Sequence, residues 1–177
     1  IDLTSSIVAD KNPDLESRDQ IARQVGISAI IFADLDYRRT RDIVFDWEEA
    51  LNFDGETGPY LQYTHARFCS ILRRYGKAVG SPTKLEKLGA EAEMRVARRL
   101  ADFPDTVGRA CDENEPSLVA TFLLELATVA NKFYNELPVL NHEDQDLVAA
   151  RIILVDCVRT VLRTGLGLLG MSVPEEM

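Results

Sequence analysis

The sequence predicts an all-α protein, built as a bundle of amphipathic helices. Prolines and glycines are sparse, at 7 and 10 of 177 residues, and long segments run between them. Apolar side chains in these segments recur every three or four positions, which is the period of a helix surface. Hydrophobic residues make up 46% of the chain and charged residues 28%, which is typical of a globular protein and not of a disordered one.

The first third of the chain predicts helices together with segments that also fit extended structure. Residues 1–9 predict the end of a helix, stopped at residues 11–13 (KNP), and residues 15–34 predict a second helix whose β-branched residues also allow a strand. Residues 42–47 (DIVFDW) alternate in polarity and predict a short extended piece, followed by a turn of helix over 48–53. Because the chain opens on Ile1 and not on methionine, we expect it to be a piece of a longer protein.

From Gly58 onward the pattern is helical throughout. Thr57 or Gly58 suits the N-cap and Pro59 the first turn of a helix that ends at Gly76. Four more helices are expected, over about residues 83–102, 104–111, 116–135 and 143–168. The last of these has apolar residues on two faces, so we expect it near the centre of the bundle.

Charge is distributed unevenly along the chain, whose net charge is −9. Residues 1–57 contain 6 basic and 13 acidic groups, residues 58–111 contain 10 and 5, and residues 112–177 contain 4 and 11. The middle third is therefore a basic block in an acidic chain. Two interpretations stay open: a solvated helix surface rich in arginine, or a local patch that contacts phosphates despite the unfavourable net charge.

The helix after Pro59 contains the most informative pattern. Tyr60, Tyr63, Arg67 and Arg74 are spaced 3, 4 and 7 residues apart, which places them on one stripe of a helix. Beside it runs an apolar stripe that we expect to face the core, made of Leu61, Phe68, Leu72 and Tyr75. Aromatic rings and guanidinium groups on an exposed strip suit the bases and phosphates of unpaired RNA. The spacing alone also allows the tyrosines to be ordinary packing residues with their hydroxyls at the rim.

Other groupings give weaker indications of chemistry. His65 and Cys69 are four residues apart on a helix, so a thiolate–imidazole pair is geometrically possible, but Cys69 adjoins the core stripe and we expect it to be buried and inert. Six acidic residues between positions 34 and 49 are expected on a solvated face. The odd, scattered cysteines (Cys69, Cys111, Cys157) fit a reducing cytosol, and their spacing does not support a metal site. We therefore predict no catalytic residue, no metal and a cytoplasmic location.

Residues 44–74 (VFDWEEALNFDGETGPYLQYTHARFCSILRR) resemble the junction of the catalytic and anticodon-binding domains in arginyl-tRNA synthetases. The preceding run VGISAIIFADLDYRRTRDIVFDW resembles the end of that family's class I catalytic domain. Further on, KFYNELPVL and GLGLLGMSVPEEM resemble two later marks of its DALR-type anticodon-binding domain. The resemblance covers nearly the whole chain and is weakest over about 76–114. It divides the chain into residues 1–56, a catalytic-domain remnant with a connector, and residues 57–177, the anticodon-binding domain.

This resemblance implies a helical bundle that grips the anticodon loop of arginine tRNA. The positions that match the family's anticodon contacts are Tyr60, Tyr63, Arg67, Tyr134 and Met177. We add Arg74, which the helical spacing places on the same stripe.

The parent enzyme would join arginine to its tRNA with ATP and Mg²⁺. The HIGH-type and KMSK-type motifs that bind ATP in class I synthetases are absent from this sequence, so we expect neither a cofactor nor ligase activity from the chain alone. The expected partner is arginine tRNA, with no DNA and no membrane, and the expected parent is monomeric. Two alternatives remain: a protein-interaction or dimerisation module without tRNA binding, and a hydrolase or transferase that uses the Cys69–His65 pair or the acidic residues.

Overall fold

The computed structural model describes residues 4–6, 17–81 and 84–177. Helices and their connections make up these three ranges, and no strand occurs within them, which confirms the predicted fold class. Of the first predicted helix, only residues 4–6 are described and they are helical. The predicted stop at residues 11–13 and the predicted helix starts at residues 15 and 83 lie outside the described residues.

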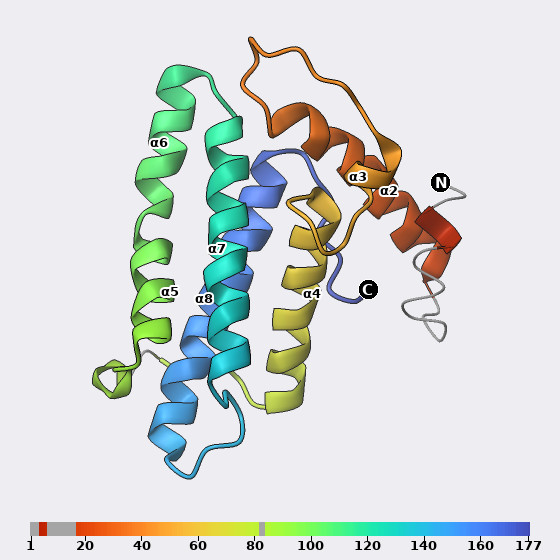
Figure 1. Cartoon of the computed structure of the whole chain (residues 1–177). Helices are drawn as coiled ribbons and strands as arrows, with labels where there is room; N and C mark the ends of the chain where they lie inside the picture. The colour runs from red at the N-terminus through yellow and green to blue at the C-terminus, as the bar shows by residue number, and fades with distance from the viewer. Residues whose placement is uncertain (1–3, 7–16, 82–83) are drawn as a thin grey trace.

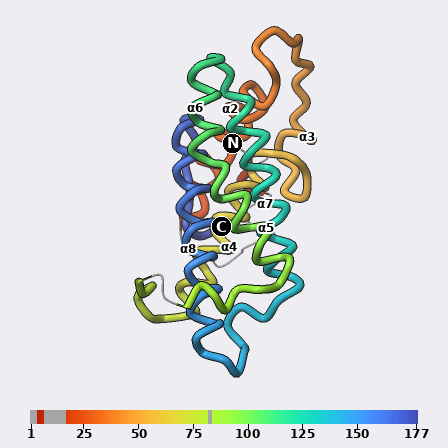
Figure 2. Tube along the Cα trace, turned by 90° about the vertical axis from the view of Figure 1, so that its left-hand side faces the viewer, coloured from red at the N-terminus to blue at the C-terminus, as the bar shows by residue number. Residues whose placement is uncertain are grey.

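The helices in chain order are α2 (Arg18–Leu35), α3 (Trp47–Ala50), α4 (Gly58–Tyr75), a 3₁₀ turn (Leu85–Lys87), α5 (Glu91–Ala101), α6 (Phe103–Glu113), α7 (Ser117–Glu136) and α8 (Gln145–Leu168). Figure 1 shows α4, α7 and α8 running side by side, with α5 and α6 stacked end to end along the outer flank of α7. Helix α2 packs against α4 on the opposite side of the molecule and brings α3 with it. In both views the C-terminus of the chain lies beside α4 (Figures 1 and 2).

Local signals set both ends of α4, as the sequence predicts. The Thr57 side chain accepts a hydrogen bond from the backbone N–H of Tyr60 at 3.2 Å, and Pro59 occupies the first turn. Gly76 closes the helix in the left-handed conformation, with φ at 68°, and its N–H donates to the carbonyl of Leu72. Because an α-helix of 18 residues is about 27 Å long, α4 holds side chains in register along a large part of the bundle.

One expectation about secondary structure is wrong, and a second differs by one residue. The helix expected from residue 83 begins only at Glu91, because the Glu93 carboxylate caps its first turn by accepting from the N–H groups of Gly89 and Ala90, each at 2.8 Å. The extended piece predicted at residues 42–47 agrees with the structure over residues 42–46, which are neither helix nor strand and end on an extended backbone at Asp46, whereas Trp47 already belongs to α3. A single extended segment with no neighbouring strand leaves its backbone groups unpaired and is not stable as a sheet.

The main core lies among α4, α5, α7 and α8. The predicted core stripe of α4 is confirmed: Leu61 and Phe68 are fully buried, and Leu72 and Tyr75 pack against the same cluster. Helix α8 lies at the centre as expected, with buried residues along its length. A second, small apolar cluster joins α2 to Phe53, and Tyr63 and Met177 pack against it.

None of the helices in the described part of the chain is both long enough and apolar enough to span a bilayer.

Candidate nucleic-acid interface

A hollow of about 430 Å³ opens between α4, the C-terminal end of α7 and the C-terminal tail. We call it the main hollow. Its wall includes Tyr63, Arg67 and Arg74 from α4, Tyr134 from α7, and Met177 from the tail. Five of the six predicted site residues therefore meet at one opening, although up to 114 positions separate them along the chain.

Tyr60 is the sixth predicted residue, and it does not line this hollow. Its ring packs against the main core, and its hydroxyl accepts a hydrogen bond from the side-chain amide of Asn131 at 3.0 Å. The helical spacing places Tyr60 on the stripe of Tyr63 and Arg67, but α7 covers that end of the stripe. Tyr60 therefore supports the hollow indirectly, by packing against the core and by bonding to Asn131.

The Arg67 guanidinium lies between two tyrosine rings. Its central carbon is 4.9 Å from the ring centroid of Tyr63 and 5.8 Å from that of Tyr134, which are distances for cation–π attraction. One of its N–H groups donates to the Asn131 side-chain oxygen at 2.9 Å. Among the described residues Arg67 makes no second hydrogen bond, so most of its five donors stay available to a ligand.

Asn131 is a functional residue that the sequence reasoning missed. Its oxygen accepts from Arg67, while its amide nitrogen donates to the hydroxyls of Tyr60 at 3.0 Å and Thr64 at 3.2 Å. Because the Arg67 guanidinium can only donate, the orientation of the Asn131 amide is determined by its neighbours. The only sequence signal is a polar residue within the apolar run LATVANKFY, three positions before Tyr134.

The C-terminal tail is bound to α4 by three side chains on one face of that helix. Gln62 donates to the carbonyl of Ser172 at 2.6 Å, and the His65 Nδ1 lies 3.0 Å from the carbonyl of Pro174. Arg73 donates to the carbonyl of Glu175 at 3.1 Å and pairs with the Glu176 carboxylate at 3.4 Å. Together Gln62, His65 and Arg73 form what we call the tail clamp. The tail therefore runs alongside α4 and brings Met177 to the main hollow.

The pair of His65 and Cys69 does not form a nucleophile. Cys69 is buried as expected, with its Sγ 3.8 Å and 3.7 Å from the two ring nitrogens of His65. Burial, first, and then the nearby Glu175 raise the pKa of the thiol, while burial lowers the pKa of the imidazole. Both groups are therefore neutral, the opposite of an activated thiolate–imidazolium pair. Because the Pro174 carbonyl can only accept, His65 Nδ1 holds the proton.

The acidic residues between positions 34 and 49 are exposed as expected, except for Asp36. Asp36 lies in a small hollow of about 60 Å³ beside α2, together with Glu56. Its burial, and then the charge of Glu56, raise the pKa of the Asp36 carboxyl. In the parts of the chain that are described, no three histidine, cysteine or acidic side chains are grouped in a way that suits a metal ion.

Comparison with known proteins gives one family and several relatives. The family model described as the DALR anticodon binding domain matches residues 61–177. Arginine–tRNA ligases of Clostridium botulinum (strain Langeland) and Clostridium beijerinckii are each 43% identical over all 177 residues. The chain spans 31% of the length of these curated relatives.

Solved structures give the same picture. The structure of Thermus thermophilus arginyl-tRNA synthetase aligns with a TM-score of 0.92 and 38% identity, over 98% of this chain and 30% of that one. Arginyl-tRNA synthetase from Plasmodium falciparum aligns with a TM-score of 0.79 at 23% identity, over 99% of this chain and 31% of that one, and so shares the fold.

Proposed function

The chain belongs to the family of the DALR anticodon binding domain, and from this premise we propose that it is the anticodon-binding part of an arginine–tRNA ligase. In this proposal the main hollow takes unpaired bases of the anticodon loop of arginine tRNA. The observation that carries the proposal is the meeting of Tyr63, Arg67, Tyr134 and Met177, from three separate segments, around one open space.

The chemistry of the hollow suits bases better than it suits a small polar metabolite. Tyr63 and Tyr134 provide π-faces on which any base can stack, for roughly 1–3 kcal/mol per base. Arg67 is already held beside both rings, so its free N–H groups meet the edge of a stacked base without further ordering of the side chain. Met177 adds a polarizable, apolar contact.

The electrostatics of the hollow favour a nucleic-acid backbone at this place. Arg67 and Arg74 line the opening without an ion pair to any acidic side chain of the described residues, whereas Arg73 is paired there with Glu176 and the chain as a whole has a net charge of −9. A local positive field on an acidic molecule attracts phosphates to one face and repels them from the rest. This polarity orients an approaching RNA.

We further propose that the parent protein is a monomeric, cytoplasmic enzyme that joins arginine to its tRNA, with ATP and Mg²⁺. The chain itself contributes recognition to that reaction. The candidate catalytic pair, His65 and Cys69, does not line the main hollow, and both side chains are neutral and buried.

The proposal is tested by titrating a labelled arginine tRNA anticodon stem-loop with the chain at two salt concentrations. We expect binding that weakens steeply with salt and that depends on the anticodon bases. Arg109→Ala serves as the matched control for Arg74→Ala, because Arg109 is exposed on α6, far from the hollow. Absence of binding at low salt, or equal binding of an unrelated anticodon, would contradict the proposal. A dimer by light scattering in that case would support the protein-interaction alternative.

A further inference from the structure

Helix α2 and the start of the C-terminal tail pack on the same point of α4, which is Gly58. A β-carbon at this position would lie 2.8 Å from the methyl carbon of Met171, just after α8, and 2.9 Å from the β-carbon of Phe32 on α2. Because the β-carbon of Phe32 is fixed to the α2 backbone, a side chain at position 58 would push α2 away. Glycine therefore lets α2, α4 and the tail meet closely.

Gln62 connects α2 to the tail through a single side-chain nitrogen. It is 0% exposed, and its Nε2 donates to the Ser28 hydroxyl of α2 at 3.0 Å and to the carbonyl of Ser172 in the tail at 2.6 Å. Because the carbonyl can only accept, the amide must present its nitrogen on this side. The amide oxygen has no hydrogen-bond partner among the described residues. The Ser28 hydroxyl therefore helps to fix the nitrogen that binds the tail.

The end of the tail lies on α2 as well. Apolar side chains of α2 form a small buried cluster with Phe53, and Tyr63 and Met177 pack against this cluster. The members from α2 are Ile21, Ala22 and Val25. Tyr63 and Met177 also line the main hollow, whereas no described residue of α2 does so. Helix α2 thus lies behind the wall of the hollow and touches two of its wall residues.

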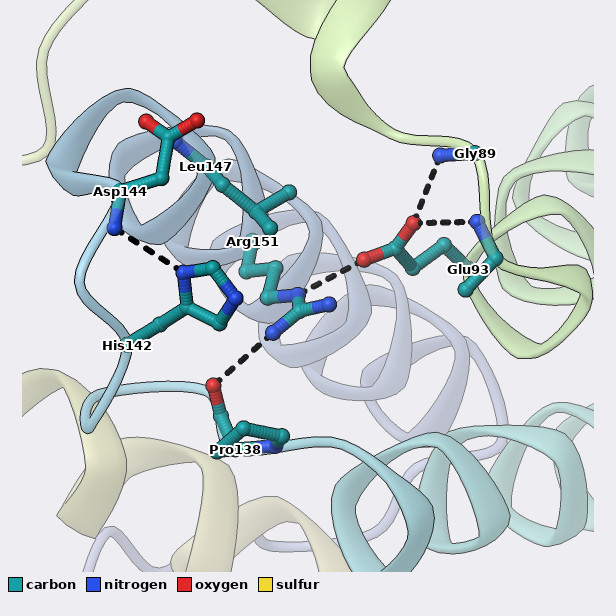
Figure 3. Close-up of polar contacts among 8 residues, drawn as sticks. Gly89, Glu93, Pro138, His142, Asp144, Leu147 and Arg151 are labelled. Atoms are coloured by element: carbon teal, nitrogen blue, oxygen red, sulfur yellow. Dashed lines mark hydrogen bonds and ion pairs between the residues drawn. The ribbon is translucent and has the colours of Figure 1, made fainter.

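The α7 side of the main hollow, at Tyr134, is held by a different network, which Figure 3 shows. Arg151 of α8 donates to the carbonyl of Pro138, just after α7, at 3.0 Å and to the buried Glu93 at 2.7 Å. The second oxygen of Glu93 accepts from two backbone N–H groups that precede α5. These contacts involve no residue of α2. The Glu93–Arg151 pair therefore braces the α7 side, and α2 lies behind the tail side.

We infer that α2 positions the tail side of the main hollow, with Ser28 and Val25 as its positioning residues. Ser28 acts through Gln62 on the start of the tail, and Val25 acts through the packing of Tyr63 and Met177. This inference rests on the proposed function of the main hollow. It extends the support of the site beyond the part of the chain that matches the DALR model, since α2 precedes residue 61. Linkage requires the reverse effect, so RNA that holds the tail in place also stabilises the packing of α2.

The first test measures the affinity of the chain for the labelled arginine tRNA anticodon stem-loop, at a temperature at which circular dichroism shows every variant folded. We expect Ser28→Ala and Val25→Ala each to weaken binding about 2- to 30-fold, the range for residues that modulate a site without touching its ligand. Val96→Ala is the matched control for Val25→Ala. Val96 is an equally buried valine on α5, which does not line the hollow, so its loss should lower the stability and leave the affinity unchanged.

Double mutants locate the effect within the hollow. Ser28→Ala should have little further effect in a Met177→Ala chain, because both substitutions act on the tail side of the wall. In a Tyr134→Ala chain it should keep its full effect, because Tyr134 belongs to the side that the Glu93–Arg151 pair braces. A general loosening of the fold would not distinguish the two backgrounds.

Hydrogen exchange measures the reverse effect. Binding of the stem-loop should slow the exchange of backbone N–H groups in α2 more than in α6, which packs on the outer flank of α7 (Figure 1). A gain in global stability alone would slow both helices alike. Ser28→Ala should reduce the difference between the two helices.

The positioning role of α2 is refuted if Val25→Ala and Val96→Ala change the affinity equally, if the losses from Ser28→Ala and Met177→Ala simply add, or if binding protects α2 and α6 equally. If the unsubstituted chain binds no stem-loop at all, the proposed function fails instead, so the two failures are distinguishable.

Discussion

Replacing His65 by leucine should weaken the docking of the C-terminal tail on α4 and so weaken RNA binding, although His65 itself is not expected to contact RNA. His65 is 1% exposed, and its Nδ1 donates to the carbonyl of Pro174, itself a buried residue. Leucine has a similar volume but no donor. The His65→Leu chain therefore keeps the packing of α4 and leaves the Pro174 carbonyl unsatisfied.

The size of the effect follows from this one contact. A buried carbonyl without a partner costs about 1–3 kcal/mol, which lowers the docking equilibrium of the tail roughly 5- to 150-fold. Gln62 and Arg73 still bind the tail on either side, so docking is weakened and not abolished. The change in RNA affinity is set by what the docked tail residues Glu176 and Met177 contribute to the main hollow, since the α4 and α7 parts of its wall stay in place.

The assay is a double-mutant cycle with a chain that lacks residues 172–177. In the full-length chain His65→Leu should lower the affinity for the stem-loop, and in the shortened chain it should have no further effect. His65→Asn should restore part of the affinity, because its amide can donate near the position of Nδ1. If His65→Leu lowers affinity equally in both chains, the residue acts through the fold or the RNA directly, and the tail-clamp interpretation is refuted.

Three further predictions follow from the same geometry. Tyr63→Ala should weaken stem-loop binding by about 1–3 kcal/mol, the value of one stacked base, while the melting temperature changes little because Tyr63 is only partly buried at the rim of a small cluster; a collapsed melting curve would instead show a core-packing role. Glu93→Ala should destabilise the chain by about 3–5 kcal/mol in urea unfolding, because it leaves the Arg151 guanidinium buried and unpaired, and a loss below about 1 kcal/mol would contradict the bracing role of this pair. The stability should also depend on pH through His65. Burial lowers the pKa of this imidazole in the folded chain, with Arg159 and Arg163 acting in the same direction and Pro174 and Glu175 opposing them. Below the ordinary histidine pKa of about 6.5 the unfolded chain then binds more protons, so this part of the stability is complete above that pH and is lost as the pH falls. Urea unfolding near pH 7.5 and near pH 5.5 should show a smaller drop for His65→Leu than for the unsubstituted chain, and equal drops would contradict the assignment.

Local patterns in the sequence were sufficient wherever the interactions themselves are local. The ends of α4 follow from Thr57 and Gly76, because a cap is satisfied within three or four residues of the helix end. The long helices α7 and α8 follow from the period of their apolar residues. The same period grouped Tyr63, Arg67 and Arg74, which the structure places around one opening.

Sequence reasoning failed where a residue far away in the chain determines the surroundings of a side chain. The cap of α5 is local, since Glu93 accepts from Gly89 and Ala90, but the partner that holds the Glu93 carboxylate buried is Arg151, 58 positions further along the chain, and the sequence does not indicate that pairing. Tyr60 and Tyr63 look equivalent as stripe residues. They differ because Asn131, 71 positions from Tyr60, bonds to the Tyr60 hydroxyl, so that Tyr60 packs inside the bundle while Tyr63 lines the main hollow.

The aromatic–arginine stripe, the caps of α4 and the basic block around them can all be obtained from the amino-acid sequence, since a helix repeats every 3.6 residues and its side chains have known directions. The hollows cannot. Tyr134 and Met177 reach the stripe only because α7 packs beside α4 and because Gln62 binds the tail across 110 positions. The period of the sequence indicates which residues share a face of a helix. Which segment packs against that face depends on the free energy of the whole core.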